Sequence, residues 1–281
     1  MASPPSSSRS TSNVTLISTV KALKDFLDTI GPSSSLYLDL EGTKLCREGT
    51  LDLITILVHP DQKASIIDVQ TLSAKAFTTA SANDDDKTMK SILEDPDIPK
   101  YIWDVRNDAD ALKSLYGVGM SGVIDIQLLE NMTRSCSSCY LRGLDKAIRL
   151  DLRLNALEVA RWTRVKGNVR DRMHKEFAIF SVRPMDQETL QYCVGDVQYL
   201  PLLKEVYMKR PVYRAQWLEK LKEESANRVQ EAHSSGYEPN GEGKVLAPWG
   251  ANPAQFFETG RQTGPYGLGG NWTLQMRAAL P

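Results

Sequence analysis

Two carboxylates, Asp39 and Glu41, stand two residues apart in the otherwise apolar run Leu36–Glu41. The run predicts a β-strand, and residues two apart on a strand point to the same face. Neighbouring carboxylates repel each other and lose hydration unless a cation lies between them. Mg²⁺ commonly binds through one or two carboxylates together with substrate phosphate, so the pair indicates a divalent metal site. A solvated strand end is the alternative, and the same spacing recurs at Asp186–Glu188, where Asp186 is expected to be a helix N-cap.

A second group of acids follows a short apolar run at 101–103, where a predicted strand gives way to a predicted helix. Asp104, Asp108 and Asp110 are all candidates on spacing alone. A strand end followed by a helix start places polar side chains at a sheet edge, where the sites of α/β proteins tend to lie. Helix capping by Asn107 or Asp108, with Asp110 as a first-turn acid favoured by the helix dipole, is the competing interpretation.

A tyrosine and an aspartate stand four residues apart at Tyr192 and Asp196, in a stretch whose apolar residues recur at helical spacing. Positions i and i+4 lie one turn apart on one face of a helix, so the hydroxyl and the carboxylate are presented together. For one such pair taken alone, an ordinary amphipathic helix with both residues on its polar flank is the simpler explanation.

The elements that must position these residues follow from the apolar periodicity, which also predicts a helix at 20–30. A short apolar run stands at 14–17, and strands are predicted at 36–41, 51–58, 64–69, 101–103 and 122–126. Short links between the first three of these strands favour antiparallel neighbours. From about residue 140 onward the pattern is mainly helical. Strands interleaved with helices predict a mixed α/β fold.

The chain has 281 residues, with 34 Lys and Arg against 35 Asp and Glu. This near-neutral balance argues against binding nucleic acid by bulk charge alone. Residues 1–13 are rich in Ser and Pro and predict a disordered tail. A domain at 14–233 follows. Residues 234–281, dense in Gly, Pro and Asn with scattered aromatic residues, predict an extended tail that is a candidate to bind a protein partner.

The sequence argues against several classes of protein. The N-terminus has no apolar run, so no secretory signal is expected, and no stretch approaches the roughly 18 consecutive apolar residues of a membrane span. Four cysteines are too few for a disulfide scaffold. Cys136 and Cys139 lack the second ligand pair of a zinc site and are interpreted as incidental thiols. We therefore expect a protein of the nucleus or cytoplasm that is not secreted and has no membrane partner.

Taken together and in this order, the three groups resemble the motifs of the DEDDy 3′–5′ exonucleases, the family of RNase D, the exosome exonuclease subunit and the Werner-type exonuclease domain. Leu38–Gly42 is similar to the first motif, Arg106–Leu112 to the second and Arg183–Leu200 to the third. Ile124–Gln127 is similar to the strand that follows the second motif. The resemblance covers about residues 14–210 and is nearest to the eukaryotic exonuclease 3′–5′ domain-like group.

The resemblance implies a ribonuclease H-like mixed sheet flanked by helices, and hydrolysis of the terminal phosphodiester of RNA or single-stranded DNA to release nucleoside 5′-monophosphates. It implies that two Mg²⁺ or Mn²⁺ ions are held by Asp39, Glu41, Asp108 and Asp196. It selects Asp108 over its two neighbouring acids and gives Tyr192 the task of orienting the attacking water. The candidate substrate-binding residues are Leu40, Trp103, Arg106, Asn107 and Arg183.

Two positions depart from the family's pattern. Trp103 stands where many relatives have His, and Gly195 replaces an alanine-like residue beside Asp196. Neither is a metal ligand in the family, so Trp103 puts substrate contacts in question but not metal binding. Residues 142–184 hold eleven basic against five acidic residues and are a candidate path for the strand, although solvated helix faces explain this excess as well.

Other functions remain compatible with the sequence. One is a nucleic-acid-binding or scaffold protein that kept the exonuclease fold and lost useful turnover. The presence of all four acids and the tyrosine favours an active enzyme over this alternative. Another is an unrelated α/β enzyme, which would leave the three motifs as coincidence.

Overall fold

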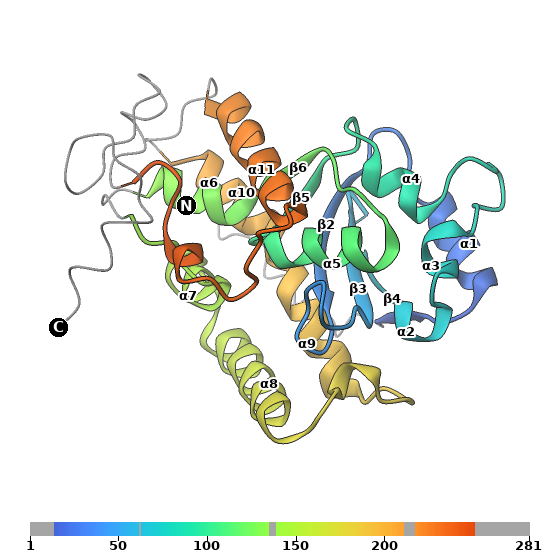
Figure 1. The fold of residues 1–281 in the computed structure, drawn as a ribbon. Helices are drawn as coiled ribbons and strands as arrows, with labels where there is room; N and C mark the ends of the chain where they lie inside the picture. The colour runs from blue at the N-terminus through green and yellow to red at the C-terminus, as the bar shows by residue number, and fades with distance from the viewer. Residues whose placement is uncertain (1–13, 62, 135–138, 211–216, 251–281) are drawn as a thin grey trace, which may run out of the picture.

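A six-stranded sheet forms the centre of the protein (Figure 1). The structure, a computed structural model, describes residues 14–61, 63–134, 139–210 and 217–250. The strand order is β1-β4-β3-β2-β5-β6. Strand β3 runs antiparallel to both of its neighbours, whereas the pairs β1–β4, β2–β5 and β5–β6 are parallel. This confirms the mixed sheet predicted from the sequence.

The strands lie where the apolar runs predicted them. Their bounds are Thr15–Ile17 (β1), Ser35–Glu41 (β2), Leu53–His59 (β3), Lys63–Asp68 (β4), Lys100–Ile102 (β5) and Val123–Asp125 (β6). Strands β2, β3 and β4 form the antiparallel series that their short links favour. Because β2 pairs with β3 on one side and β5 on the other, the strand that carries Asp39 and Glu41 lies inside the sheet.

Helices surround this sheet, and α8 projects away from it (Figure 1). Their bounds are Val20–Asp28 (α1), Val69–Leu72 (α2), Lys75–Thr78 (α3), Met89–Glu94 (α4), Arg106–Tyr116 (α5), Ile126–Thr133 (α6), Leu144–Asp151 (α7), Ala156–Lys175 (α8), Gln187–Val197 (α9), Leu200–Met208 (α10) and Trp217–His233 (α11). Two 3₁₀ turns lie at Ile179–Ser181 (η1) and Glu242–Val245 (η2).

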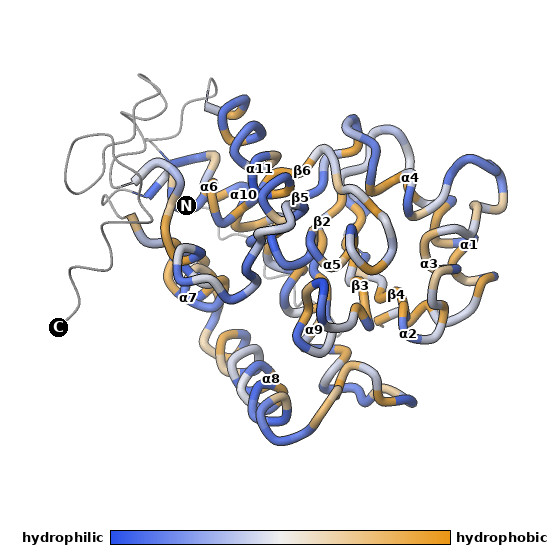
Figure 2. The backbone as a smooth tube through the Cα atoms, in the orientation of Figure 1, coloured by the Kyte–Doolittle hydropathy of each residue, from blue (hydrophilic) through white to orange (hydrophobic). Residues whose placement is uncertain are grey.

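Strand β2 separates two cores because its side chains alternate between faces. Leu36, Leu38 and Leu40 pack in one hydrophobic cluster with residues of α1 and α5. Tyr37 points the other way and packs with residues of α6 and α10. Figure 2 shows hydrophobic residues along the central strands and hydrophilic residues over much of α8. The odd-numbered residues of β2 therefore face the layer that contains α9, which contacts β2, β3 and β4.

Two helix starts bear on the site. α5 begins after Val105 without a side-chain cap, so Asn107 and Asp108 lie in its first turn and do not cap it. α9 begins after Asp186, whose side chain accepts a hydrogen bond from the backbone N–H of Thr189, as the sequence predicts. The second occurrence of the Asp-x-Glu spacing is therefore a helix cap.

The residues that follow α11 return to the domain. Within 234–250, Tyr237 and Trp249 are buried, and Trp249 Nε1 donates a hydrogen bond to Asn131 Oδ1 at 2.8 Å. The backbone N–H of Ala247 donates to the carbonyl oxygen of Cys139. The first part of the Gly- and Pro-rich segment thus docks on the domain itself.

Some predictions lie outside the described residues: the tail at 1–13, residues 251–281 of the C-terminal tail, and Cys136. Within the described part of the chain, no helix is both long and apolar enough to cross a membrane. The free cysteines there are Cys46, Cys139 and Cys193.

The docked segment leads to a stability prediction. Trp249→Ala is expected to lower the free energy of unfolding by about 3–5 kcal/mol, because it removes a fully buried indole and leaves a cavity. Val245→Ala, in the same segment but 54% exposed, should change it by no more than about 0.5 kcal/mol. Urea unfolding followed by circular dichroism measures both. Equal, small effects of the two substitutions would show that the segment does not stabilise the domain.

Candidate active site

Three of the predicted acids meet between β2 and α9. Asp39 and Glu41 of β2 and Asp196 of α9 each offer a carboxylate oxygen, and the three oxygens lie within 4.8 Å of one another. Asp196 is buried, whereas Asp39 and Glu41 are half-buried. The alternation of β2 places both of its acids on the α9 side, and the helix supplies the third.

The end of β2 is fixed by a glycine. A Cβ on Gly42 would lie 1.9 Å from the carbonyl oxygen of Thr50, so the chain can pass this close only without a side chain. Beside it, the backbone N–H of Asp52 donates to the carbonyl oxygen of Glu41 at 2.9 Å. This close approach of the two segments holds Glu41 at its place in the site.

Asp108 approaches the same site from the first turn of α5 and is 7% exposed. Its carboxylate is not one of the three clustered oxygens, but its charge raises the pKa of Glu41, so the four acids interact. The two other candidates in this stretch are paired elsewhere. Asp104 accepts hydrogen bonds from Arg106, and Asp110 accepts them from Arg47.

The turn that delivers Asp108 is held by Asp125, at the end of β6. The Asp125 carboxylate accepts hydrogen bonds from the backbone N–H groups of Asp104 and Val105, at 3.1 and 3.2 Å. Arg228 of α11 donates to the same carboxylate at 2.6 Å. Asp125 belongs to the strand that resembles the family's segment after the second motif, and its contacts show that this acid braces the start of α5.

Burial and mutual repulsion raise the pKa values of the clustered acids. Burial, followed by the charge of Asp196, raises the pKa of Asp39 to about 7. Burial and then the charge of Asp39 raise the pKa values of Glu41 and Asp108 well above their usual range. Burial also raises the pKa of Asp196, although Lys166 opposes this. Full ionisation of the site therefore requires added positive charge.

The donor set suits a divalent metal ion. Carboxylate oxygens are the ligands that Mg²⁺ and Mn²⁺ prefer. Among the described residues, the buried Oδ2 of Asp39 has no hydrogen-bond partner. A buried polar atom without a partner is costly, and a cation between the three carboxylates would satisfy it.

Tyr192 lies one turn before Asp196 on α9 and is 7% exposed. Burial, followed by the charges of Glu41 and Asp196, raises the pKa of its hydroxyl above the usual range. The phenol therefore stays protonated at neutral pH and can donate a hydrogen bond to a water or to substrate.

A lysine also enters the acid cluster. Lys166 of α8 is 7% exposed, and its Nζ donates a hydrogen bond to Asp196 Oδ1. The same Nζ lies 3.8 Å from Asp145 Oδ1. Burial lowers the pKa of Lys166, but the charge of Asp196 and their hydrogen bond outweigh this and raise it, so the side chain is an ammonium ion.

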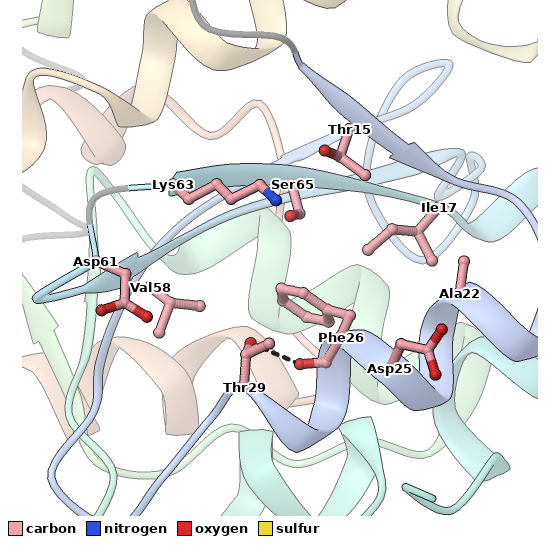
Figure 3. Close-up of a pocket in the computed structure, with 10 residues that line it drawn as sticks. All are labelled: Thr15, Ile17, Ala22, Asp25, Phe26, Thr29, Val58, Asp61, Lys63 and Ser65. Atoms are coloured by element: carbon pink, nitrogen blue, oxygen red, sulfur yellow. Dashed lines mark hydrogen bonds between the residues drawn. The ribbon is translucent and has the colours of Figure 1, made fainter.

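The site opens into a cavity of about 360 Å³. Its acidic floor faces a basic rim, since Lys146, Arg149 and Arg170 line it as well. Lys146 and Arg149 are exposed to solvent. A second cavity, of about 330 Å³, lies between α1 and strands β1, β3 and β4 (Figure 3). In the described part of the chain, only the first cavity holds a cluster of three potential metal ligands.

Two of the five predicted substrate-binding residues line the cavity that holds the acids, and three do not. Leu40 and Trp103 lie on its wall, where the buried Nε1 of Trp103 has no partner among the described residues. The Leu40 side chain packs in the core on the opposite face of β2, so the residue meets the cavity through its backbone. Arg183 is instead held by Asp68, with Nε donating at 2.7 Å.

The two predicted contacts on α5 are also engaged within the chain. Arg106 donates to Asp104 at 2.6 and 2.7 Å and is buried. Asn107 Oδ1 accepts hydrogen bonds from Tyr237 Oη at 2.6 Å and from Lys244 Nζ at 2.5 Å. These side chains position α5 and the docked C-terminal segment. Their contact with substrate stays a prediction.

Sequence reasoning did not single out Asp145, and it treated Lys166 only as one basic residue among many. A signal for Lys166 was present, because Trp162, Lys166 and Arg170 recur at intervals of four and so share a face of α8. Nothing in the spacing shows that this face meets α9.

Comparison with known proteins identifies the family. The 3′–5′ exonuclease family matches residues 14–209, which is most of the chain. The chain therefore belongs to the 3′–5′ exonuclease family and is a hydrolase of that class, as the three motifs predict. A search of curated proteins gave no significant match.

Solved structures of the same architecture agree with the fold. Trypanosoma brucei RNase D in complex with RNA U12 has a TM-score of 0.67 and 21% identity, covering 83% of this chain and 75% of that chain. The GMP complex of that protein has a TM-score of 0.69 and 21% identity, covering 91% and 74%. Escherichia coli RNase D has a TM-score of 0.52 and 19% identity, covering 79% and 51%. At these identities the likeness establishes an RNase D-like fold.

The raised pKa of Asp39 leads to a prediction about the metal-free protein. Because the pKa rises from 3.8 to about 7 on folding, the stability that this group contributes is fully present below about pH 4 and is lost as the pH rises through 7. With EDTA at pH 8, Asp39→Asn is expected to stabilise the fold by an amount on the order of 1 kcal/mol. The gain should shrink towards pH 4. Thermal unfolding at both pH values measures it.

Asp85→Asn provides the control, since Asp85 is an exposed aspartate that does not line the cavity. It should not change the unfolding temperature by a comparable amount at either pH. A destabilising effect of Asp39→Asn at pH 8 would contradict the repulsion inferred among the acids.

Proposed function

We propose that this protein is a divalent-metal-dependent 3′–5′ exonuclease that removes nucleoside 5′-monophosphates from the 3′ end of RNA, with single-stranded DNA as a second substrate to be tested. The observation that carries the proposal is the convergence of Asp39, Glu41 and Asp196 within 4.8 Å, at the floor of an open cavity in a fold of the 3′–5′ exonuclease family.

Each residue of the site has a role in the proposed reaction. Asp39, Glu41, Asp108 and Asp196 would hold two Mg²⁺ or Mn²⁺ ions. Bound divalent ions supply positive charge that polarises the phosphate and lowers the pKa of the attacking water. Tyr192, whose hydroxyl stays protonated, donates a hydrogen bond that orients this water. Trp103 and the Leu40 backbone border the position of the terminal nucleotide.

The basic residues that line the cavity favour a substrate that carries phosphate groups. Lys146 and Arg149 of α7 are exposed and line the cavity, and Arg170 of α8 lines it as well. Basic side chains placed in this way bind a nucleic-acid backbone without reading its sequence. All three lie in the basic segment 142–184, so basic residues that are concentrated in this part of the sequence also line the cavity.

The comparisons support RNA as the first substrate to test. Similar structures include an RNase D bound to RNA U12, the same RNase D bound to GMP, and another described as an exoribonuclease involved in structured RNA processing. We place the activity in the nucleus or cytoplasm, because the cysteines of the described residues are free thiols. A protein partner for residues 251–281 remains part of the proposal.

The direct test is a 5′-labelled single-stranded RNA, and its DNA equivalent, incubated with Mg²⁺ or Mn²⁺. The wild-type protein is expected to shorten the strand from its 3′ end and release nucleoside 5′-monophosphates. Asp39→Ala and Asp196→Asn should each lower the rate by more than about a hundredfold, because even outer partners of metal ligands cost 10–100-fold. Gel ladders and chromatography of the products measure both outcomes.

Asp186→Asn is the matched control. Asp186 stands at the other Asp-x-Glu pair, caps α9 and does not line the cavity, and Asn caps helices equally well. Binding of RNA with no shortening under either metal would contradict the proposal and favour the scaffold alternative. A strong preference for single-stranded DNA would remove RNA as the main substrate.

The role of Tyr192 gives a separate kinetic prediction. Tyr192→Phe should lower kcat by about tenfold or more while leaving KM nearly unchanged, because it removes a hydrogen bond that positions the attacking water. Since the hydroxyl is protonated throughout the neutral range, the shape of the pH–rate profile should not change between pH 6 and 9. An unchanged kcat would show that the hydroxyl has no part in the reaction.

A further inference from the structure

Lys166 of α8 lies against the acid cluster. Its ammonium group donates to Oδ1 of Asp196, one of the three clustered acids. The rings of Tyr192 and Trp162 flank it, with centroids 4.6 and 5.8 Å from Nζ. A cation held between acids and aromatic faces replaces part of the charge that the cluster lacks.

A glycine allows α8 to come this close. A Cβ on Gly195 would lie 3.3 Å from both Cδ1 and Nε1 of Trp162, which is tighter than an ordinary contact. Glycine at this position leaves room for the indole against α9. Because Trp162 and Lys166 lie one turn apart on α8, packing at Gly195 places Lys166 next to Asp196. The departure from the family's pattern at Gly195 therefore accompanies the approach of the lysine.

A second acceptor for the same ammonium lies beside the first. Asp145 Oδ1 is 3.8 Å from Lys166 Nζ, is buried, and has no hydrogen-bond partner among the described residues. The other oxygen, Oδ2, pairs with Arg170. The side chain of Lys166 therefore has one acceptor that it uses and a second, unused one within reach.

We propose that Lys166 is a resident cation that balances the acid cluster in the metal-free protein, and that it transfers from Asp196 to Asp145 when a divalent metal ion binds. The inference rests on the proposed metal-dependent function. An ammonium ion and a metal ion on the same Asp196 carboxylate repel each other, because they are like charges at short distance. Lys166 therefore competes with the metal ion for the Asp196 carboxylate. Asp145 is the acceptor to which the ammonium group moves when the metal ion binds.

The ammonium stays at the cavity when it transfers, because Lys166 and Asp145 both line it. Asp145 lines the cavity together with Lys146 and Arg149. At Asp145 the ammonium would lie beside the residue that precedes Lys146 in this basic rim, where positive charge favours the phosphates of a strand. Lys166 is thus a positioning residue that couples metal binding to the charge of the cavity.

Equilibrium binding of Mn²⁺, followed by the electron paramagnetic resonance signal of the free ion, tests the competition without any turnover. Lys166→Met should raise the affinity for Mn²⁺ by tenfold or more, because the competing cation is gone. Lys146→Met removes the same charge from the same cavity without touching Asp196, and should raise it by less than threefold. A lower or unchanged affinity in Lys166→Met would overturn the proposal.

A double-mutant cycle tests the second acceptor. Asp145→Asn should weaken Mn²⁺ binding by threefold or more, because the ammonium then loses the negatively charged acceptor that would hold it. In the Lys166→Met background the same substitution should have less than a twofold effect. An equal effect in both backgrounds would show that Asp145 acts on the metal only through its own charge, which would overturn the role given to it.

A measurement on the wild-type protein covers the case in which Lys166→Met does not fold. Acetylation by acetic anhydride, read by mass spectrometry, should be slow at Lys166 without metal and at least threefold faster with Mg²⁺. Unchanged labelling in a protein that binds Mg²⁺ would overturn the transfer and leave the proposed function standing. A wild-type protein that binds no divalent metal would contradict the proposed function itself.

Discussion

The repulsion among buried carboxylates is the constraint on which the rest of the site depends. Asp39, Glu41, Asp108 and Asp196 come from a strand and two helices, and the charges of Asp39, Asp108 and Asp196 each raise the pKa of at least one other acid of the group. Such an arrangement is stable only if protons or cations compensate it. A fold that contains such a cluster of carboxylates must hold the acids rigidly and leave a path by which cations can enter. The cavity with its basic rim provides that path.

The framework that holds the acids is correspondingly well braced. Gly42 lets the end of β2 pass against Thr50, and Asp125 with Arg228 fixes the turn that delivers Asp108. The segment after α11 closes over α5, where Lys244 binds Asn107. Residues far apart along the chain thus restrict the same few backbone segments. Preorganisation of this kind keeps mutually repelling groups in place before any ligand arrives.

Much of the fold and of the acid site was predictable from the sequence, because both depend on strong local patterns of residues. The apolar run around Asp39 and Glu41 predicted the strand, and alternation predicted their common face. The choice of Asp108 over Asp104 and Asp110 came only from resemblance, since all three have plausible spacing. In the structure Asp104 and Asp110 pair with arginines, and the choice of Asp108 stays a prediction.

The parts of the fold and of the site that the sequence did not predict depend on tertiary contacts. Such contacts produce no pattern in the local sequence. Arg183 was a candidate for substrate contact, yet it is held by Asp68, on a distant strand. Trp249 lies in a Gly- and Pro-rich stretch whose composition predicts a tail, yet it is fully buried against Asn131. Lys166 meets Asp196 only because α8 folds back onto α9. Composition and periodicity describe single elements, not which elements meet.

The central claim is that these carboxylates form a divalent metal site. The most direct measurement is the anomalous difference map of crystals grown with Mn²⁺ and a nucleoside 5′-monophosphate. The account predicts two peaks enclosed by the four acids Asp39, Glu41, Asp108 and Asp196, with the Lys166 ammonium turned to Asp145. A map at saturating Mn²⁺ with no peak among these carboxylates, and with Lys166 still bound to Asp196, would contradict it.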